Sequence, residues 1–244
     1  MAWIGSRYHA GMKLLLVSNS TLHGQGYLDH CAAAMQAFLG PAVRRVLFVP
    51  YALADRDAYH AKARQRFEAL GVQLESIHQA SDPRTAAAAA EAFFVGGGNT
   101  FRLLAELRRQ GLLPVMRDVV RAGTPYMGSS AGSNVACATI MTTNDMPIVD
   151  PGGFDALGLV PFQINPHYLD PTPGSTHMGE TREERLRQYH ELNARPVVGL
   201  REGAWLRVQS GQVHLEGSSG ARLFFAGKTP VETLPPARLE LPLG

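Results

Sequence analysis

Short runs of apolar residues alternate with helix-patterned segments through the first 130 residues of the chain. Within residues 13–18, 45–50 and 93–95, the apolar residues stand at consecutive positions rather than at every second one. Strands with two apolar faces are typical of a parallel sheet that helices cover on both sides. The alternation therefore predicts an α/β fold, a three-layer sandwich with a mostly parallel central sheet.

Two more strands are expected in this half of the chain, at residues 72–77 and in the apolar run that leads to Ser130. The intervening segments have helical spacing or composition, and the expected helices are 27–39, 55–70, 86–92, 101–109 and 113–121.

The pattern is looser in the second half of the chain. Residues 142–173 contain six prolines and are expected to form mainly loop. Residues 181–192 predict a helix that starts with a capping box, Thr181 with Glu184. Alternating segments at 204–208, 212–215 and 222–225, separated by glycine turns, predict a small terminal β-meander. We expect residues 1–11 to be an N-terminal extension and residues 12–244 to form a single catalytic domain.

Charge and cysteine content exclude several classes of protein. The net charge is +2 and basic residues are scattered, which argues against a nucleic-acid partner. No apolar run reaches the roughly 18 residues of a membrane span. The cysteines, Cys31 and Cys137, are far apart, which favours a reducing cytoplasm over a disulfide framework. No cofactor or metal site is expected, since the glycines at 96–98 fit no nucleotide-binding pattern.

Gly128, Ser130 and Gly132 form a Gly-x-Ser-x-Gly pattern directly after an apolar run. This is the layout of a nucleophile elbow, in which a sharp strand-to-helix turn exposes the serine. The N–H of Ala131 would then lie at a helix N-terminus, where it can stabilise an oxyanion. We expect the second oxyanion donor to be a backbone N–H of Gly98 or Asn99, in the other glycine-rich loop.

A serine nucleophile needs a base and a group that orients the base. His167 is the favoured base because it follows an apolar run at an expected strand end, and His177 is its rival. Spacing alone does not choose the orienting acid; the candidates are Asp145, Asp150, Asp155, Asp170 and Glu202.

Six stretches of the sequence resemble peptidase E, the α-aspartyl dipeptidase family of serine peptidases. They are LLLVSNST (14–21), VGGGNTFRLL (95–104), GSSAGSN (128–134), TTNDMPIVDPGGFDALGL (142–159), QINPHYLD (163–170) and GETREERL (179–186). The resemblance implies a fold like that of class I glutamine amidotransferases, with serine in place of the nucleophilic cysteine. It also implies hydrolysis of dipeptides that have an N-terminal aspartate.

Carried over by position, the resemblance implies Ser130 as nucleophile, His167 as base and Asp145 as orienting acid, with Glu202 as the alternative acid. Ser129 stands where the family has tryptophan, which is expected to enlarge the pocket or to alter the preference for the leaving residue.

Aspartyl specificity requires a cation for the side-chain carboxylate of the substrate. Arg182 is favoured over Arg185 and Arg201, because it is the first arginine after the helix cap. Asn99 and Glu202 are further candidates for substrate binding. The expected partner is a small dipeptide, and the expected assembly is a monomer or homodimer. Alternative functions are a cyanophycinase-like β-aspartyl peptidase, an amidotransferase subunit, or a binding protein without catalysis on the same fold.

Overall fold

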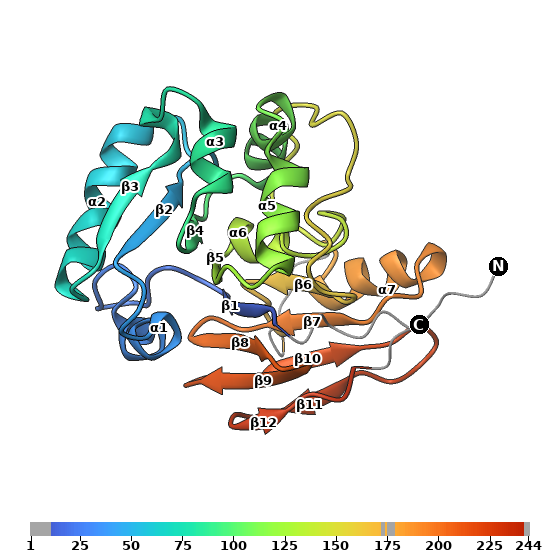
Figure 1. Ribbon diagram of the computed structural model, residues 1–244. Coiled ribbons are helices and arrows are strands. Elements are labelled where there is room, and N and C mark those ends of the chain that lie inside the picture. Colours follow the sequence, from blue (N-terminus) through green and yellow to red (C-terminus); the bar gives the residue numbers. More distant parts are fainter. Residues whose placement is uncertain (1–10, 172–173, 175–178, 242–244) are drawn as a thin grey trace.

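The structure of the protein, a computed structural model, describes residues 11–171, 174 and 179–241 and has an α/β fold (Figure 1). Of the expected N-terminal extension only Gly11 is described, and His177 lies outside the described residues.

The main sheet has the strand order β12-β9-β8-β1-β5-β4-β2-β3. Its parallel part consists of β1 (Lys13–Val17), β5 (Tyr126–Ser129), β4 (Phe93–Val95), β2 (Arg45–Val49) and β3 (Gln73–Ser76). The antiparallel part consists of β8 (Ala204–Gln209), β9 (Gln212–Gly217) and β12 (Ala237–Arg238). The predicted mostly parallel sheet is therefore confirmed, with an antiparallel extension beyond β1.

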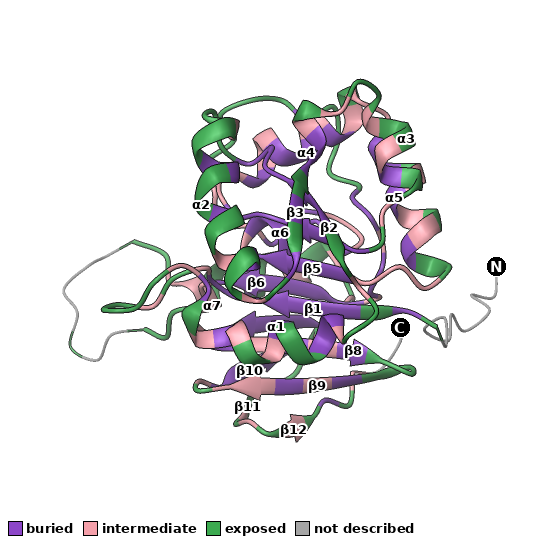
Figure 2. Ribbon diagram, turned by 60° about the vertical axis from the view of Figure 1, so that its left-hand side comes forward, coloured by how far each residue is buried: buried purple, intermediate pink, exposed green. Residues whose placement is uncertain are grey.

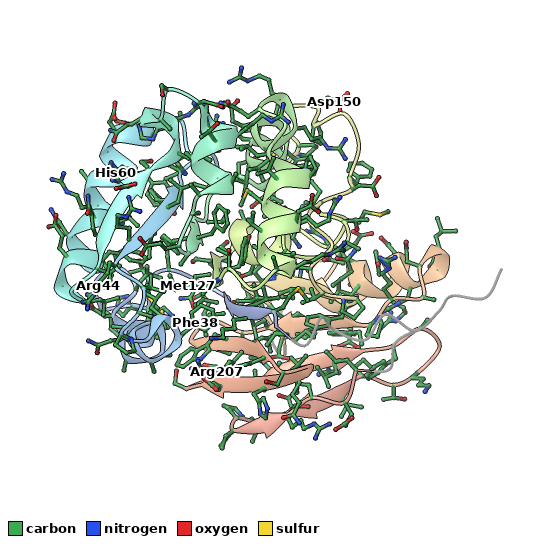
Figure 3. The ribbon with its side chains drawn as sticks, in the orientation of Figure 1. Phe38, Arg44, His60, Met127, Asp150 and Arg207 are labelled. Carbon is green, nitrogen blue, oxygen red and sulfur yellow. The ribbon has the colours of Figure 1, made fainter. Side chains whose placement is uncertain are left out.

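Helices cover both faces of the parallel part, and the side chains of each strand point alternately to the two faces. Leu15 and Val17 of β1 pack with Phe38 and Met127 on the side of α1 (Ala32–Leu39) and α2 (Arg56–Ala69) (Figure 3). Leu14 belongs to the other core, on the side of α3 (Pro83–Ala88), α4 (Thr100–Arg109) and α5 (Leu112–Arg121). Figure 2 shows the buried strands between these helix layers. This double burial is what made the strands apolar throughout.

A second sheet has the order β11-β10-β7-β6. It consists of β6 (Gln163–Pro166), β7 (Val197–Leu200), β10 (Ala221–Phe224) and β11 (Val231–Thr233), of which β6 and β7 are parallel. One face of this sheet packs into the hydrophobic core that it shares with the main sheet. Helix α7 (Arg182–Leu192) packs on the other face through Leu186. The capping box of Thr181 and Glu184 is present as predicted.

The three segments predicted to form a terminal β-meander are strands, but they divide between the two sheets. Strands β8 and β9 extend the main sheet, whereas β10 lies in the second sheet. The pairing of β8 with β1 covers an edge of the parallel sheet that would otherwise leave backbone groups unpaired. Strand β6 forms inside the region expected to be mainly loop, and it ends directly before His167, where a strand end was expected.

The expected helix limits also change in two places. The helix expected at 27–39 is divided into the short 3₁₀ helix η1 (Asp29–Cys31) and α1. The helix expected at 86–92 begins earlier, at Pro83, because Asp82 caps it by accepting from the N–H of Arg84. A further 3₁₀ helix, η2 (Ile77–Gln79), follows β3. Within the described residues, no helix is both long enough and apolar enough to cross a bilayer.

Candidate active site

Ser130 lies in a sharp turn between β5 and α6 (Ala131–Asn134), and its φ of 53° and ψ of −111° are strained values for a residue other than glycine. The turn depends on the two flanking glycines. A Cβ on Gly128 would lie 2.5 Å from the carbonyl oxygen of Gly132, and a Cβ on Gly132 would collide with the carbonyl oxygen of Val95. The predicted elbow geometry is therefore confirmed.

His167 and Glu202 complete a hydrogen-bonded relay with this serine. The Ser130 Oγ is 3.0 Å from the His167 Nε2, and the His167 Nδ1 is 2.6 Å from the Glu202 Oε1. If Nδ1 donates to the carboxylate, Nε2 is left to accept the hydroxyl proton of the serine. The three side chains come from the ends of β5, β6 and β7, and they have the order of nucleophile, base and orienting acid.

The orienting acid expected from the sequence was Asp145, and the structure corrects that assignment. The Asp145 Oδ2 accepts from the backbone N–H of Thr100 at 2.7 Å and from its hydroxyl at 2.6 Å. Asp145 is thereby attached to the first residue of α4, whereas Glu202, which follows β7, contacts the His167 ring. Nearness in sequence to the elbow was misleading: the loop after α6 reaches the strand before His167, where Asn144 donates to the Pro166 carbonyl, but the Asp145 side chain is bonded to Thr100.

The other candidate acids have different surroundings. Asp150 is exposed on the loop after α6 and accepts from the N–H of Gly152 (Figure 3). Asp170 is paired with Arg201, and Asp155 forms an isolated β-bridge with Thr139.

The backbone of His167 is attached to the end of β1 through Ser18. The hydroxyl of the buried Ser18 accepts from the N–H of His167 at 2.9 Å and donates to the carbonyl of Leu200 at 2.7 Å. Asn19 similarly accepts from the N–H of Gly203, next to Glu202, at 2.9 Å. Sequence reasoning treated Ser18 as the end of a strand and Asn19 as part of a turn. The available signal was that polar residues at the end of one parallel strand face the site residues at the same edge.

Two backbone N–H groups remain as oxyanion donors. No acceptor is found for the N–H of Gly98 or Ala131 in the described part of the chain. The alternative, the N–H of Asn99, is excluded because it donates to the carbonyl of Ala52 at 2.9 Å. The loop runs directly beside the nucleophile, since a Cβ on Gly97 would lie 3.0 Å from that of Ser130.

Ser130 and His167 open into a cleft of about 940 Å³, which is large enough for a small ligand. Arg182 and Asp145 line it together with Thr143, and so does the loop of Gly98. Ser129 does not line it: its side chain is fully buried.

Arg182 is a cation of this cleft and has no carboxylate within 4 Å among the described residues. Burial lowers the pKa of its guanidinium, the neighbouring Arg185 lowers it further, and the charge of Asp145 opposes both. The two rival arginines are engaged elsewhere. Arg185 lies 3.7 Å from Glu180, and Arg201 is bonded to Asp170 and Glu232.

The side chain of Asn99, which was expected to bind substrate, is engaged within the protein. Its Oδ1 caps α4 by accepting from the N–H of Arg102 at 3.0 Å, and its Nδ2 donates to the carbonyl of Met146 at 2.9 Å. Glu202, the other residue expected to bind substrate, is bonded to His167 instead.

Solved structures of low identity have the same fold. A structure titled a putative peptidase E protein from Listeria monocytogenes has a TM-score of 0.65 at 24% identity and covers 85% of this chain and 99% of its own. A peptidase from an acI-B1 Actinobacterium has a TM-score of 0.66 at 15% identity and covers 96% of both chains.

Curated relatives are much more similar in sequence. Peptidase E of Streptomyces coelicolor is 56% identical, covering 91% of this chain and 90% of the relative. A probable α-aspartyl dipeptidase of Drosophila melanogaster is 50% identical, covering 93% and 95%. Peptidase E of Salmonella typhimurium is 47% identical, covering 90% and 96%. The sequence pattern of peptidase family S51 matches residues 14–216. Because the family pattern covers most of the chain and a relative is 56% identical to it, the chain belongs to peptidase family S51.

Proposed function

We propose that this protein is a serine dipeptidase that removes N-terminal aspartate from dipeptides, with Ser130, His167 and Glu202 as its catalytic residues. The observation that carries the proposal is the relay from the strained elbow serine through His167 to Glu202. The names of relatives at 47–56% identity, peptidase E and α-aspartyl dipeptidase, support the same reaction.

The reaction proceeds in two steps. His167 accepts the proton of the Ser130 hydroxyl as its oxygen attacks the carbonyl carbon of the aspartyl residue. The N–H groups of Gly98 and Ala131 stabilise the oxyanion, and the imidazolium then protonates the leaving amine. Water, activated by the same histidine, hydrolyses the aspartyl ester on Ser130. Glu202 holds the imidazole in orientation and stabilises its charged form.

Arg182 is proposed to bind the side-chain carboxylate of the substrate. A guanidinium can form two parallel hydrogen bonds with a carboxylate, and a neutral asparagine amide has only one oxygen to accept them. The partly buried position of Arg182 on the cleft wall, without a competing acid within 4 Å in the described chain, supports this role.

The test is release of free aspartate by the purified protein. Asp-Leu is compared with β-Asp-Arg, the substrate expected of a cyanophycinase-like enzyme. We expect turnover of Asp-Leu, and a loss of about 10³-fold or more in Ser130→Ala. Ser129→Ala is the matched control, because this neighbouring hydroxyl is buried away from the cleft and should be dispensable.

Faster cleavage of β-Asp-Arg would instead assign the β-aspartyl reaction. Unchanged activity in Ser130→Ala would exclude the serine mechanism. An amidotransferase is disfavoured because the elbow carries serine where that class uses cysteine.

The remaining expectations concern the setting of the enzyme. We propose that residues 12–244 act as a single domain, in the cytoplasm, as a monomer or a homodimer. Light scattering coupled to size-exclusion chromatography distinguishes the two assembly states.

A further inference from the structure

The cleft continues past Ser130 to the side opposite Arg182. Figure 1 shows α2 and α7 on opposite sides of the turn between β5 and α6. Lys62 of α2 lines the cleft there, with Tyr27 and Tyr59, whereas Arg182 of α7 lines it on the other side. The cleft therefore has a cation on each side of the nucleophile.

Lys62 is available to an anionic ligand. Within the described residues, no carboxylate lies within 4 Å of its ammonium group. Asp55, an acid of the cleft wall at the start of the same helix, is occupied as the cap of α2 and accepts from the N–H of Ala58 at 2.9 Å. Because the helix N-terminus is capped in this way, Lys62 supplies the positive charge on this side of the cleft.

The position of the ammonium group is restricted by the aromatic wall. The Lys62 Nζ lies 4.9 Å from the centre of the Tyr27 ring, in the geometry of a cation–π contact. Tyr27 is itself held in place: its carbonyl accepts from the Arg66 side chain at 2.9 Å, and its hydroxyl lies 3.3 Å from that of Tyr59. The lysine is exposed but directed along a fixed surface.

We propose that Lys62 binds the free α-carboxylate of the leaving residue and thereby selects dipeptides over longer peptides. This inference rests on the proposed function. If the aspartyl residue binds toward Arg182, the leaving residue lies on the other side of Ser130, toward α2. In a dipeptide that residue ends in a carboxylate, one residue beyond the scissile bond. A longer peptide has a neutral amide at the same place and makes no ion pair with Lys62.

The expected effect is moderate, because an exposed ion pair is screened by water and salt. Lys62→Met should raise the KM for Asp-Leu about tenfold and leave kcat within about twofold, since the contact is made equally in the ground and transition states. For Asp-Leu amide, which has no free carboxylate, the KM should stay the same. The variant should therefore lose most of the preference for the free acid.

The experiment measures initial rates of aspartate release from Asp-Leu and Asp-Leu amide at low salt. Lys62→Arg keeps the cation and should keep the preference for the free acid. Arg64→Met is the matched control: it removes a positive charge from an exposed position of the same helix, where Arg64 pairs with Glu68 and does not line the cleft.

Three results would overturn the inference while leaving the proposed function intact. They are equal KM values for the two substrates in the unchanged protein, a loss in Lys62→Met that is the same for both, and an equal loss in Arg64→Met. Failure of the unchanged protein to release aspartate from either substrate would instead reject the proposed function, and this inference with it.

Discussion

Ser130 and the two side chains of the relay, His167 and Glu202, are held in place in two different ways. Ser130 depends on a short segment of the main sheet, in which Gly128 and Gly132 allow the backbone to bend. His167 and Glu202 follow two parallel strands of the second sheet, and long-range bonds to Ser18 and Asn19 attach them to β1. The elbow is therefore formed mainly by neighbouring residues, with the close approach of Gly132 to Val95 as its long-range contact. The relay needs β1, β6 and β7 to assemble.

Substitutions in the elbow and in the relay should therefore have different effects on stability and activity. A change in the elbow acts through backbone strain and steric overlap, so stability should be lost together with activity. A change in the relay removes a polar contact from an intact fold, so activity should fall more than stability.

The largest expected effect comes from Glu202→Gln. The neutral amide no longer stabilises the imidazolium that forms in the transition state, and we expect kcat to fall about 10³-fold. Asp145→Asn is the comparison, and its kcat should change less than about tenfold, because Asp145 is bonded to Thr100. The measurement is the kcat of both variants in steady-state kinetics with Asp-Leu. The opposite ranking would return the orienting role to Asp145.

The elbow is tested by Gly132→Ala. Overlap of the new Cβ with the carbonyl oxygen of Val95 should lower the free energy of unfolding by about 3 kcal/mol and remove activity in parallel. Urea denaturation measures the stability. Gly227→Ala is the converse case, since Gly227 has a positive φ of 69°, which Gly132 does not have, and nothing lies within 4 Å of its added Cβ. That control should cost about 1 kcal/mol. Equal losses in the two variants would contradict the steric account.

Arg182→Met tests recognition of aspartate, on the helix that packs on the second sheet. We expect kcat/KM for Asp-Leu to fall about 100-fold, because the substrate carboxylate loses a charged hydrogen-bonding partner. The ratio of Asp-Leu to Asn-Leu hydrolysis should narrow. Arg185→Met, on the same helix but paired with Glu180, should leave both rates unchanged. A selectivity that survives in Arg182→Met would place the cation elsewhere.

The smallest effect is expected for Ser18→Ala, which cuts the link between β1 and the relay. It leaves the N–H of His167 and the carbonyl of Leu200 without this partner, so stability should fall by about 1–3 kcal/mol. Displacement of the base should lower kcat about tenfold with little change in KM. Ser133→Ala provides a reference, because this buried hydroxyl bonds to the carbonyls of Val17 and Gly128 and does not contact His167. A kcat unchanged in Ser18→Ala would show that the link is structural only.

The sequence by itself was sufficient for features that depend on short-range pattern. Consecutive apolar residues predicted β1 and β2, because a strand buried on both faces leaves no position for a polar side chain. The elbow was readable because close packing of the backbone leaves no room for a Cβ at two fixed positions, Gly128 and Gly132. The capping box of α7 was also readable, because its two partners lie within one helical turn.

Only the tertiary structure decided which side chains meet. Asp145 and Glu202 are both acids beyond the elbow, and no local pattern ranks them. Their roles follow from where the loop after α6 and the strand β7 end in space. The assignment of β8 to the main sheet and of β10 to the second sheet has the same origin. An alternating pattern predicts that a segment forms a strand. Which strand it pairs with depends on the sheet edge that is still unpaired and the apolar face that is still uncovered.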